Sequence, residues 1–79
     1  MTLQELRQAV TEATTPTEEL ITAVLDFADD LDPYGFRDYY GIPGTPEFNM
    51  TEAREDAIYM LTEARQELLE QIDFAIQEA

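Results

Sequence analysis

The sequence contains no cysteine, histidine, serine, lysine or tryptophan. Without the first four, the chain lacks the usual general base at neutral pH, the usual nucleophiles and the amine that forms Schiff bases. The absence of cysteine and histidine also removes the ligands that zinc, copper and iron sites use, so a cation could be held by oxygen ligands alone. These absences predict a protein that is not an enzyme and that uses no cofactor.

Basic residues are scarce as well. Four arginines stand against 18 aspartates and glutamates, which gives a formal net charge of −14 over 79 residues. Such a charge is repelled by anionic membranes and by nucleic-acid backbones, so direct binding to either is not expected. The partner that this charge favours is a basic protein surface.

The length of the chain limits its organisation. Seventy-nine residues, 44% of them apolar, suffice for one domain with a modest core. We therefore predict a single acidic helical domain over residues 1–79, as a monomer or a homodimer. The first residues show no basic segment followed by an apolar run, and no stretch reaches the length of a membrane span. A cytoplasmic location is expected, in the host cytoplasm if the protein is viral.

Two helix-start signals lie in the first third of the chain. Thr2 followed by Glu5 fits a capping box at the start of a short first helix. Thr15 followed by Pro16 predicts that a second helix begins at residue 16 and runs to about residue 31. The apolar arc of this second helix is broad, which predicts that it is the most buried helix of the fold.

The middle of the chain combines a third start signal with most of the aromatic residues. Asp32 before Pro33 and Gly41 as a stop favour a short helix over residues 33–40. Five of the eight aromatic residues lie close together here, namely Tyr34, Phe36, Tyr39, Tyr40 and Phe48. Two interpretations are open: a small satellite core at the open end of the fold, or a tyrosine-rich contact patch.

Residues 49–79 read as one long helix with an apolar face and an acidic face. Two starts are open: Asn49 as the cap before Met50, or Thr45 as the cap before Pro46. The predicted fold is all-α, either a three-helix bundle or a helical hairpin. In both, a first arm broken by proline packs against the long C-terminal helix, and a short fourth helix over 33–40 is compatible with either.

The acidic face of the predicted long helix contains the candidate partner-binding residues. Carboxylates three or four residues apart on a helix stand about 5 to 6 Å from one another, close to the spacing of phosphates along one nucleic-acid strand. Large apolar rings among these acids would serve as anchors in an interface. The candidates are Glu52, Asp56, Tyr59, Glu63, Glu67, Glu70, Asp73 and Phe74.

These features lead to three hypotheses. The first is a small inhibitor that mimics nucleic-acid charge and blocks the basic nucleic-acid site of a host protein. In acidity and shape the chain resembles the DNA-mimic inhibitors that viruses use against host defence enzymes, although no motif identifies a family. The second is an acidic adaptor or assembly factor that binds a partner helix through an apolar and aromatic groove. The third is a halophilic or structural protein whose acidity only solvates its surface.

Two further features have competing interpretations. Arg54 and Arg65 fall in or beside the apolar face of the predicted long helix. The preferred interpretation is that their guanidiniums reach acids of the second helix or the aromatic segment, and the alternative is a symmetric dimer in which they meet acids of a second chain. Asp30, Asp32 and Asp38 match part of a calcium-binding loop, but the bidentate glutamate of such a loop is replaced by glycine. An acidic helix end is therefore the preferred interpretation of these aspartates.

Overall fold

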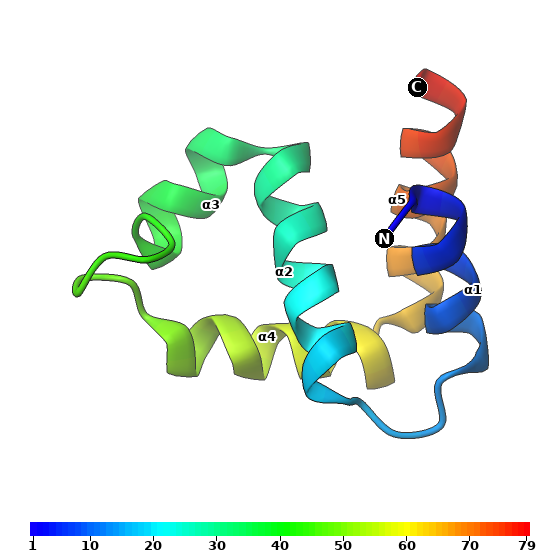
Figure 1. Cartoon of the computed structure of the whole chain (residues 1–79), viewed down its shortest axis with the longest axis horizontal. Coiled ribbons are helices and arrows are strands. Elements are labelled where there is room, and N and C mark those ends of the chain that lie inside the picture. The colour runs from blue at the N-terminus through cyan, green and yellow to red at the C-terminus, as the bar shows by residue number, and fades with distance from the viewer.

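The protein is helical throughout. The computed structural model describes residues 1–79 and contains five α-helices and no strand (Figure 1). The helices are α1 (Leu3–Glu12), α2 (Glu18–Leu31), α3 (Pro33–Tyr40), α4 (Met50–Thr62) and α5 (Arg65–Glu78). The prediction of an all-α fold is confirmed. No helix combines the length with the apolar composition that a membrane span requires.

Local capping signals set the starts of α1 and α4. The amide of Glu5 donates to the hydroxyl of Thr2 at 3.1 Å and the amide of Thr2 donates to the carboxylate of Glu5 at 3.0 Å, which confirms the predicted capping box. At α4 the cap is Asn49, whose side-chain oxygen accepts the amide of Glu52 at 3.1 Å. Of the two starts that the sequence leaves open for this segment, the structure therefore has the later one.

The start of α2 lies two residues beyond the predicted one. Its cap is Thr17, whose hydroxyl accepts the amide of Leu20 at 3.2 Å, while Thr15 and Pro16 belong to the connecting segment. Capping by Thr17 places glutamates 18 and 19 in the first helical turn, where the positive end of the helix dipole favours acids.

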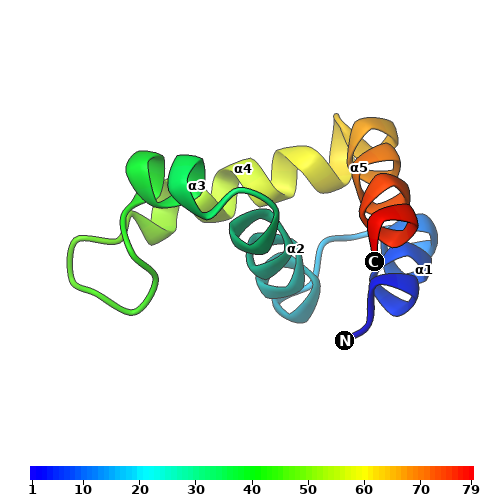
Figure 2. The same ribbon diagram turned by 90° about the horizontal axis from the view of Figure 1, so that it is seen from above.

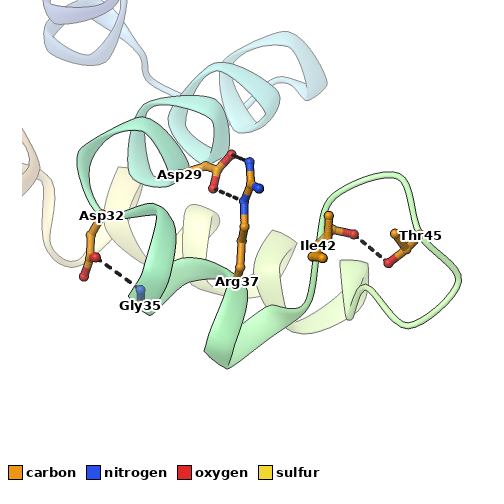
Figure 3. Close-up of polar contacts among 6 residues, drawn as sticks. All are labelled: Asp29, Asp32, Gly35, Arg37, Ile42 and Thr45. Atoms are coloured by element: carbon orange, nitrogen blue, oxygen red, sulfur yellow. Dashed lines mark hydrogen bonds and ion pairs between the residues drawn. The ribbon is translucent and has the colours of Figure 1, made fainter.

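Two glycines allow the tight geometry of α3. The amide of Gly35 donates to the carboxylate of Asp32, the cap of this helix, at 3.1 Å (Figure 3), and a Cβ on Gly35 would collide with that carboxylate. Gly41 ends the helix with a φ of 98°, and a Cβ there would lie 3.1 Å from both the Glu47 carbonyl oxygen and the Cα of Phe48. The positive φ and the backbone contacts make the end of α3 at Gly41 specific to glycine, whereas at Gly35 a side chain would displace the Asp32 cap.

The prediction of one long helix over residues 49–79 is wrong, because the chain turns at Glu63 and Ala64 between α4 and α5. Ala64 has φ −116° and ψ 30°, which departs from helical values. The carbonyl of Tyr59 accepts the amides of Glu63 at 2.8 Å and Ala64 at 3.0 Å. Nε of Arg65 donates to the carbonyl of Leu61 at 3.1 Å. The end of α4 is thus satisfied without glycine or proline, the usual sequence signs of a helix end.

The turn has a geometric reason. A straight helix over residues 50–78 would be about 43 Å long at 1.5 Å per residue, whereas the longest dimension of the fold is 32 Å. Part of its apolar face would then have no neighbours to pack against. Because the chain turns, Leu61 of α4 and both Leu68 and Ile72 of α5 enter one core, where each is at most 2% exposed.

The helices surround α2. In Figures 1 and 2, α1 lies beside α5, α4 crosses beside α2, and α3 sits over the start of α4. The first two helices therefore do not form one broken arm against a single long helix. The buried side chains are all apolar: Leu6, Val10, Leu20, Ile21, Val24, Leu25, Phe27, Phe36, Ala53, Ala57, Leu61, Leu68 and Ile72. Five of these thirteen come from α2, more than from any other helix, which confirms that it is the most buried helix.

Candidate partner-binding surface

The turn between α4 and α5 separates the candidate residues into two groups. Glu52, Asp56 and Tyr59 belong to α4, Glu63 lies in the turn, and Glu67, Glu70, Asp73 and Phe74 belong to α5. In Figure 1, α4 runs across the lower part of the molecule and α5 rises from its end. The straight row of carboxylates expected from the sequence is therefore absent, and each group has its own surroundings.

The two candidate acids of α4, Glu52 and Asp56, are bound by tyrosines of α3. The hydroxyl of Tyr39 donates to the carboxylate of Glu52 at 2.8 Å, and the hydroxyl of Tyr40 donates to the carboxylate of Asp56 at 2.5 Å. Glu52 also accepts the side-chain amide of Asn49 at 3.3 Å. These two carboxylates fasten α3 to α4, so they contribute to the fold rather than to a free acidic face.

The ring of Tyr40 packs on the hydrophobic core through Phe36. The ring of Phe36, which is buried, lies 4.9 Å from the ring of Tyr40 and 6.1 Å from that of Phe48, measured between centroids. Tyr39 packs edge-on against Tyr40 at 4.7 Å. Tyr34, at 90% exposure, lies outside this cluster. The satellite-core interpretation thus holds for Phe36, Tyr40 and Phe48, which join the main core, while Tyr39 and Tyr34 are exposed.

The surroundings of the two phenols favour their neutral forms. Burial raises the pKa of Tyr40 well above its usual value, and the hydrogen bond to Asp56 raises it further. For Tyr39 the hydrogen bond to Glu52 is the main cause of a raised pKa. Both hydroxyls therefore remain donors to their carboxylates at neutral pH.

A third candidate acid, Asp73, is paired with an arginine of α1. Nε of Arg7 lies 2.5 Å from one carboxylate oxygen of Asp73, and the second guanidinium contact is 3.4 Å. The hydrogen bond raises the pKa of Arg7. Since both side chains are more than 40% exposed, water weakens this pair. It nevertheless gives the Asp73 carboxylate a partner within the chain.

The other five candidate residues face solvent. Glu63, Glu67 and Glu70 are exposed, and none of them is in an ion pair. The two rings among them are also uncovered, since Tyr59 is 58% exposed and Phe74 is 61% exposed. Of the surface expected from the sequence, this is the part that remains available to a partner.

Phe74 lies beside a shallow hollow between α5 and the end of α2. The hollow has a volume of about 320 Å³ and is lined by Leu31, Glu67, Glu70, Gln71 and Phe74. Leu31, the last residue of α2, is 46% exposed. Two apolar side chains and two free carboxylates thus meet on one surface, although they come from helices far apart in the sequence.

A larger hollow lies between the start of α1, the second half of α2 and α5. Its volume is about 530 Å³, and its lining includes the apolar side chains of Leu3, Phe27 and Leu31 with the carboxylates of Asp26 and Asp30. Leu31 lines both hollows, so they are adjacent. The sequence pattern does not single out this surface, because Leu31 falls within the broad apolar arc of α2. Leu31 is the last residue of α2, and this position was the available signal that neighbouring side chains would cover it less than the rest of the apolar arc.

The prediction that both arginines of the C-terminal segment reach acids is correct for one of them. Arg54 forms an ion pair with Glu18 in the first turn of α2, and its hydrogen bond lowers the pKa of that carboxyl. The guanidinium of Arg65 instead donates to the Leu61 carbonyl at the end of α4. That bond was not foreseen because the turn at this point was not.

The contacts of the aspartates near the end of α2 bear on the partial match to a calcium-binding loop. Arg37 pairs with Asp29 at 3.2 Å, and Asp32 caps α3 (Figure 3). No group of three or more acidic side chains in the structure is arranged to hold a metal ion, and this includes Asp30, Asp32 and Asp38. The preferred interpretation of Asp32 as a helix cap is confirmed.

Comparisons with known proteins identify no relative. No protein-family model, curated protein or solved structure matches this chain.

Proposed function

We propose that this chain is a small acidic protein-binding protein that occupies a basic surface of a partner. In the specific form of the proposal, the surface is the nucleic-acid site of a host protein, which the chain blocks by presenting charge of the same sign as a nucleic acid. The proposal includes action in the host cytoplasm as a virus-encoded inhibitor. It involves no catalysis, no cofactor and no direct contact with nucleic acid or membrane.

The excess of carboxylates that have no arginine partner supports this proposal most strongly. All 18 acids lie outside the core, and three of them are in ion pairs with arginines. The remaining fifteen form a strongly negative surface, which accelerates encounter with a basic protein and repels nucleic acids.

The exposed rings support a specific interface rather than attraction by charge alone. Tyr59 and Phe74 lie uncovered beside Glu63, Glu67 and Glu70. Aromatic side chains that become buried in an interface account for much of its binding energy, while surrounding charges mainly raise the association rate. The proposed contact surface is therefore the outer side of the α4–α5 turn and of α5.

A test begins with the immobilised chain and a lysate of the host. Proteins captured at about 50 mM salt are eluted at about 300 mM, because shortening the Debye length weakens attraction between surfaces. The affinity of a purified captured protein is then measured with and without a nucleic-acid duplex. The proposal expects competition by the duplex and an affinity that falls at least about tenfold across this salt range.

A matched pair of variants separates local from general charge. The triple variant Glu63→Gln, Glu67→Gln and Glu70→Gln is compared with Glu12→Gln, Asp38→Asn and Glu47→Gln, which removes the same total charge from other exposed positions. The first set is expected to weaken binding much more than the second. Equal weakening would contradict the proposed surface, and affinity that is unchanged at high salt would contradict the charge-based mechanism.

A second candidate function is an acidic adaptor that binds a partner helix through an apolar groove. The observation in its favour is the pair of adjacent hollows that share Leu31. The two functions differ in their response to salt, since burial of apolar surface persists where attraction between charges is screened. Phe74→Ala, which truncates a ring lining the smaller hollow, would abolish the adaptor's salt-tolerant binding.

A further inference from the structure

The two hollows form one continuous surface. Leu31 stands between them, with Phe27 and Ala75 in the larger hollow and Phe74 beside the smaller one. Leu31 and Phe74 are 46% and 61% exposed, which is high for large apolar side chains on adjoining helices. Their arrangement leaves apolar area that a partner could cover. We refer to the surface lined by Leu31, Phe74 and the walls of both hollows as the α2–α5 groove.

The charges around the α2–α5 groove have one sign. Asp26 and Asp30 line the larger hollow, while Glu67 and Glu70 line the smaller one. No arginine lines either hollow. Arg7, one residue from the groove residue Leu6, is directed to Asp73. The groove therefore combines an apolar floor with four carboxylates that lack a basic partner, which is the complement of an apolar stripe flanked by basic residues.

We propose that the α2–α5 groove binds a basic amphipathic helix of a partner protein. The inference rests on the proposed function for the class of partner and adds the place and the shape of the contact. Apolar side chains one turn apart on a helix are about 5 to 6 Å from one another, so successive anchors can enter the hollows on either side of Leu31. Lysines or arginines flanking that stripe then meet the four carboxylates.

Other occupants fit the α2–α5 groove less well. A peptide that binds by strand addition needs a sheet edge, and this fold has no strand. An anionic membrane would be repelled by the net charge of −14. A second copy of the chain would bring the same charge to the same surface, so its acids would oppose association. A basic helix is the occupant that satisfies both the apolar floor and the acidic sides.

The direct test uses a synthetic peptide of about 18 residues, or five helical turns, with leucines repeated at helical spacing and lysines on the remaining face. A second peptide has the same composition in scrambled order. Fluorescence anisotropy of each labelled peptide is measured against the full chain at about 150 mM salt. The amphipathic peptide is expected to bind at least tenfold more tightly than the scrambled one, because only the former presents a continuous apolar stripe.

Variants of the chain then locate the contact. The pair Leu31→Ala and Phe74→Ala is expected to weaken binding of the amphipathic peptide at least tenfold, while Tyr34→Ala, which removes a more exposed ring elsewhere, changes it less than twofold. A second comparison tests the charges by their effect on binding of the amphipathic peptide. One variant replaces the four groove acids by their amides, at Asp26, Asp30, Glu67 and Glu70, and the control makes the same change at Glu12, Asp38, Glu47 and Glu55. Circular dichroism verifies that every variant keeps its helix content.

Three results would overturn the proposal. The first is that the amphipathic and scrambled peptides bind with equal affinity. The second is that the two sets of charge variants weaken peptide binding equally. The third is that sedimentation shows a dimer of the chain that Phe74→Ala dissociates. Equal weakening together with nucleic-acid competition for the captured partner would leave the charge-based function standing and remove only the groove. Tight, groove-dependent peptide binding without such competition would instead remove the nucleic-acid-site function and retain the groove.

Discussion

Two places in this fold bring acids next to aromatic rings, with opposite results. At the contact of α3 and α4, Asp56 accepts the hydroxyl of Tyr40 at 2.5 Å, and the ring packs on buried Phe36. In the hollow between α5 and the end of α2, Glu70 and Phe74 line the same surface, and Glu70 forms no ion pair. A phenol can donate to a carboxylate and a phenyl ring cannot. One hydroxyl group therefore separates an acid that supports the fold from an acid that is free to bind.

The comparison shows why an acidic helix face is a poor guide to function by itself. Glu52 and Asp56 are four residues apart, and Glu67, Glu70 and Asp73 follow one another at three-residue spacing. Of these five acids, only Glu52, Asp56 and Asp73 have partners within the chain. A hydrogen bond to a charged group contributes about 1.5 to 3 kcal/mol to stability when it is shielded from water. An exposed carboxylate without a partner contributes little. The two kinds of acid are separable by measuring stability and binding on the same variants.

The largest expected effect is a loss of stability, caused by truncating a side chain in the core that positions both regions. Leu61→Ala removes a side chain that is 1% exposed and lies next to the turn between α4 and α5. The expected loss of unfolding free energy is about 2 to 5 kcal/mol, because a cavity remains after truncation. Urea denaturation followed by circular dichroism measures this loss. Gln66→Ala, at an exposed position near the same turn, is the control and should change stability little.

The next effect tests the contact of α3 and α4. Tyr40→Phe keeps the ring and removes the hydroxyl that donates to Asp56. We expect a loss of about 1.5 to 3 kcal/mol in unfolding free energy, since a half-buried carboxylate loses its donor. Tyr39→Phe should cost less, because its ring is 66% exposed and water can replace the bond to Glu52. A smaller loss for Tyr40→Phe than for Tyr39→Phe would contradict this account of the contact.

The same contact predicts a dependence on alkaline pH. The pKa of Tyr40 is raised in the folded protein by burial and by Asp56, so the neutral phenol is favoured more in the folded state than in the unfolded state. This contribution to stability is complete below the unfolded pKa of about 10 and is lost as the pH rises through the folded pKa. Denaturation midpoints should therefore be little changed from about pH 8 to 9 and should fall above about pH 10, more steeply for the wild type than for Tyr40→Phe.

A smaller effect concerns the free acids as a group. Raising the salt concentration from about 10 mM to 150 mM shortens the Debye length from about 30 Å to 8 Å, which weakens repulsion within a chain of net charge −14. Thermal unfolding midpoints should rise modestly over this range, with the chain folded throughout. A chain that required molar salt to show helical circular dichroism would favour halophilic adaptation and reduce the case for partner binding.

The smallest effect on stability belongs to the α2–α5 groove. Glu67→Gln, Glu70→Gln and Phe74→Ala alter exposed side chains that share one hollow. Each is expected to change the unfolding free energy by less than about 0.5 kcal/mol, while partner binding falls. A large loss of stability on Phe74→Ala would place this ring with the structural residues and would remove the contrast with Tyr40.

Local signals in the sequence were sufficient for several parts of the fold. The capping box of Thr2 and Glu5 and the Asp32 cap involve residues three positions apart, so their geometry follows from the chain itself. The breadth of the apolar arc of α2 correctly indicated burial on several sides. The start of α2 was misplaced because Thr15 and Thr17 offer equivalent hydroxyls two residues apart, and the sequence does not rank them.

The sequence by itself therefore determined an all-helical, strongly acidic chain with α2 at its centre, because helical periodicity and net charge are properties of neighbouring residues. Only the tertiary structure decided where the C-terminal segment turns and which acids stay free. The turn at Ala64 has no glycine or proline to mark it; it follows from the need to bury Leu61 and Ile72 in one compact core. Whether a carboxylate meets Tyr40, Arg7 or solvent likewise depends on helices that only packing brings together.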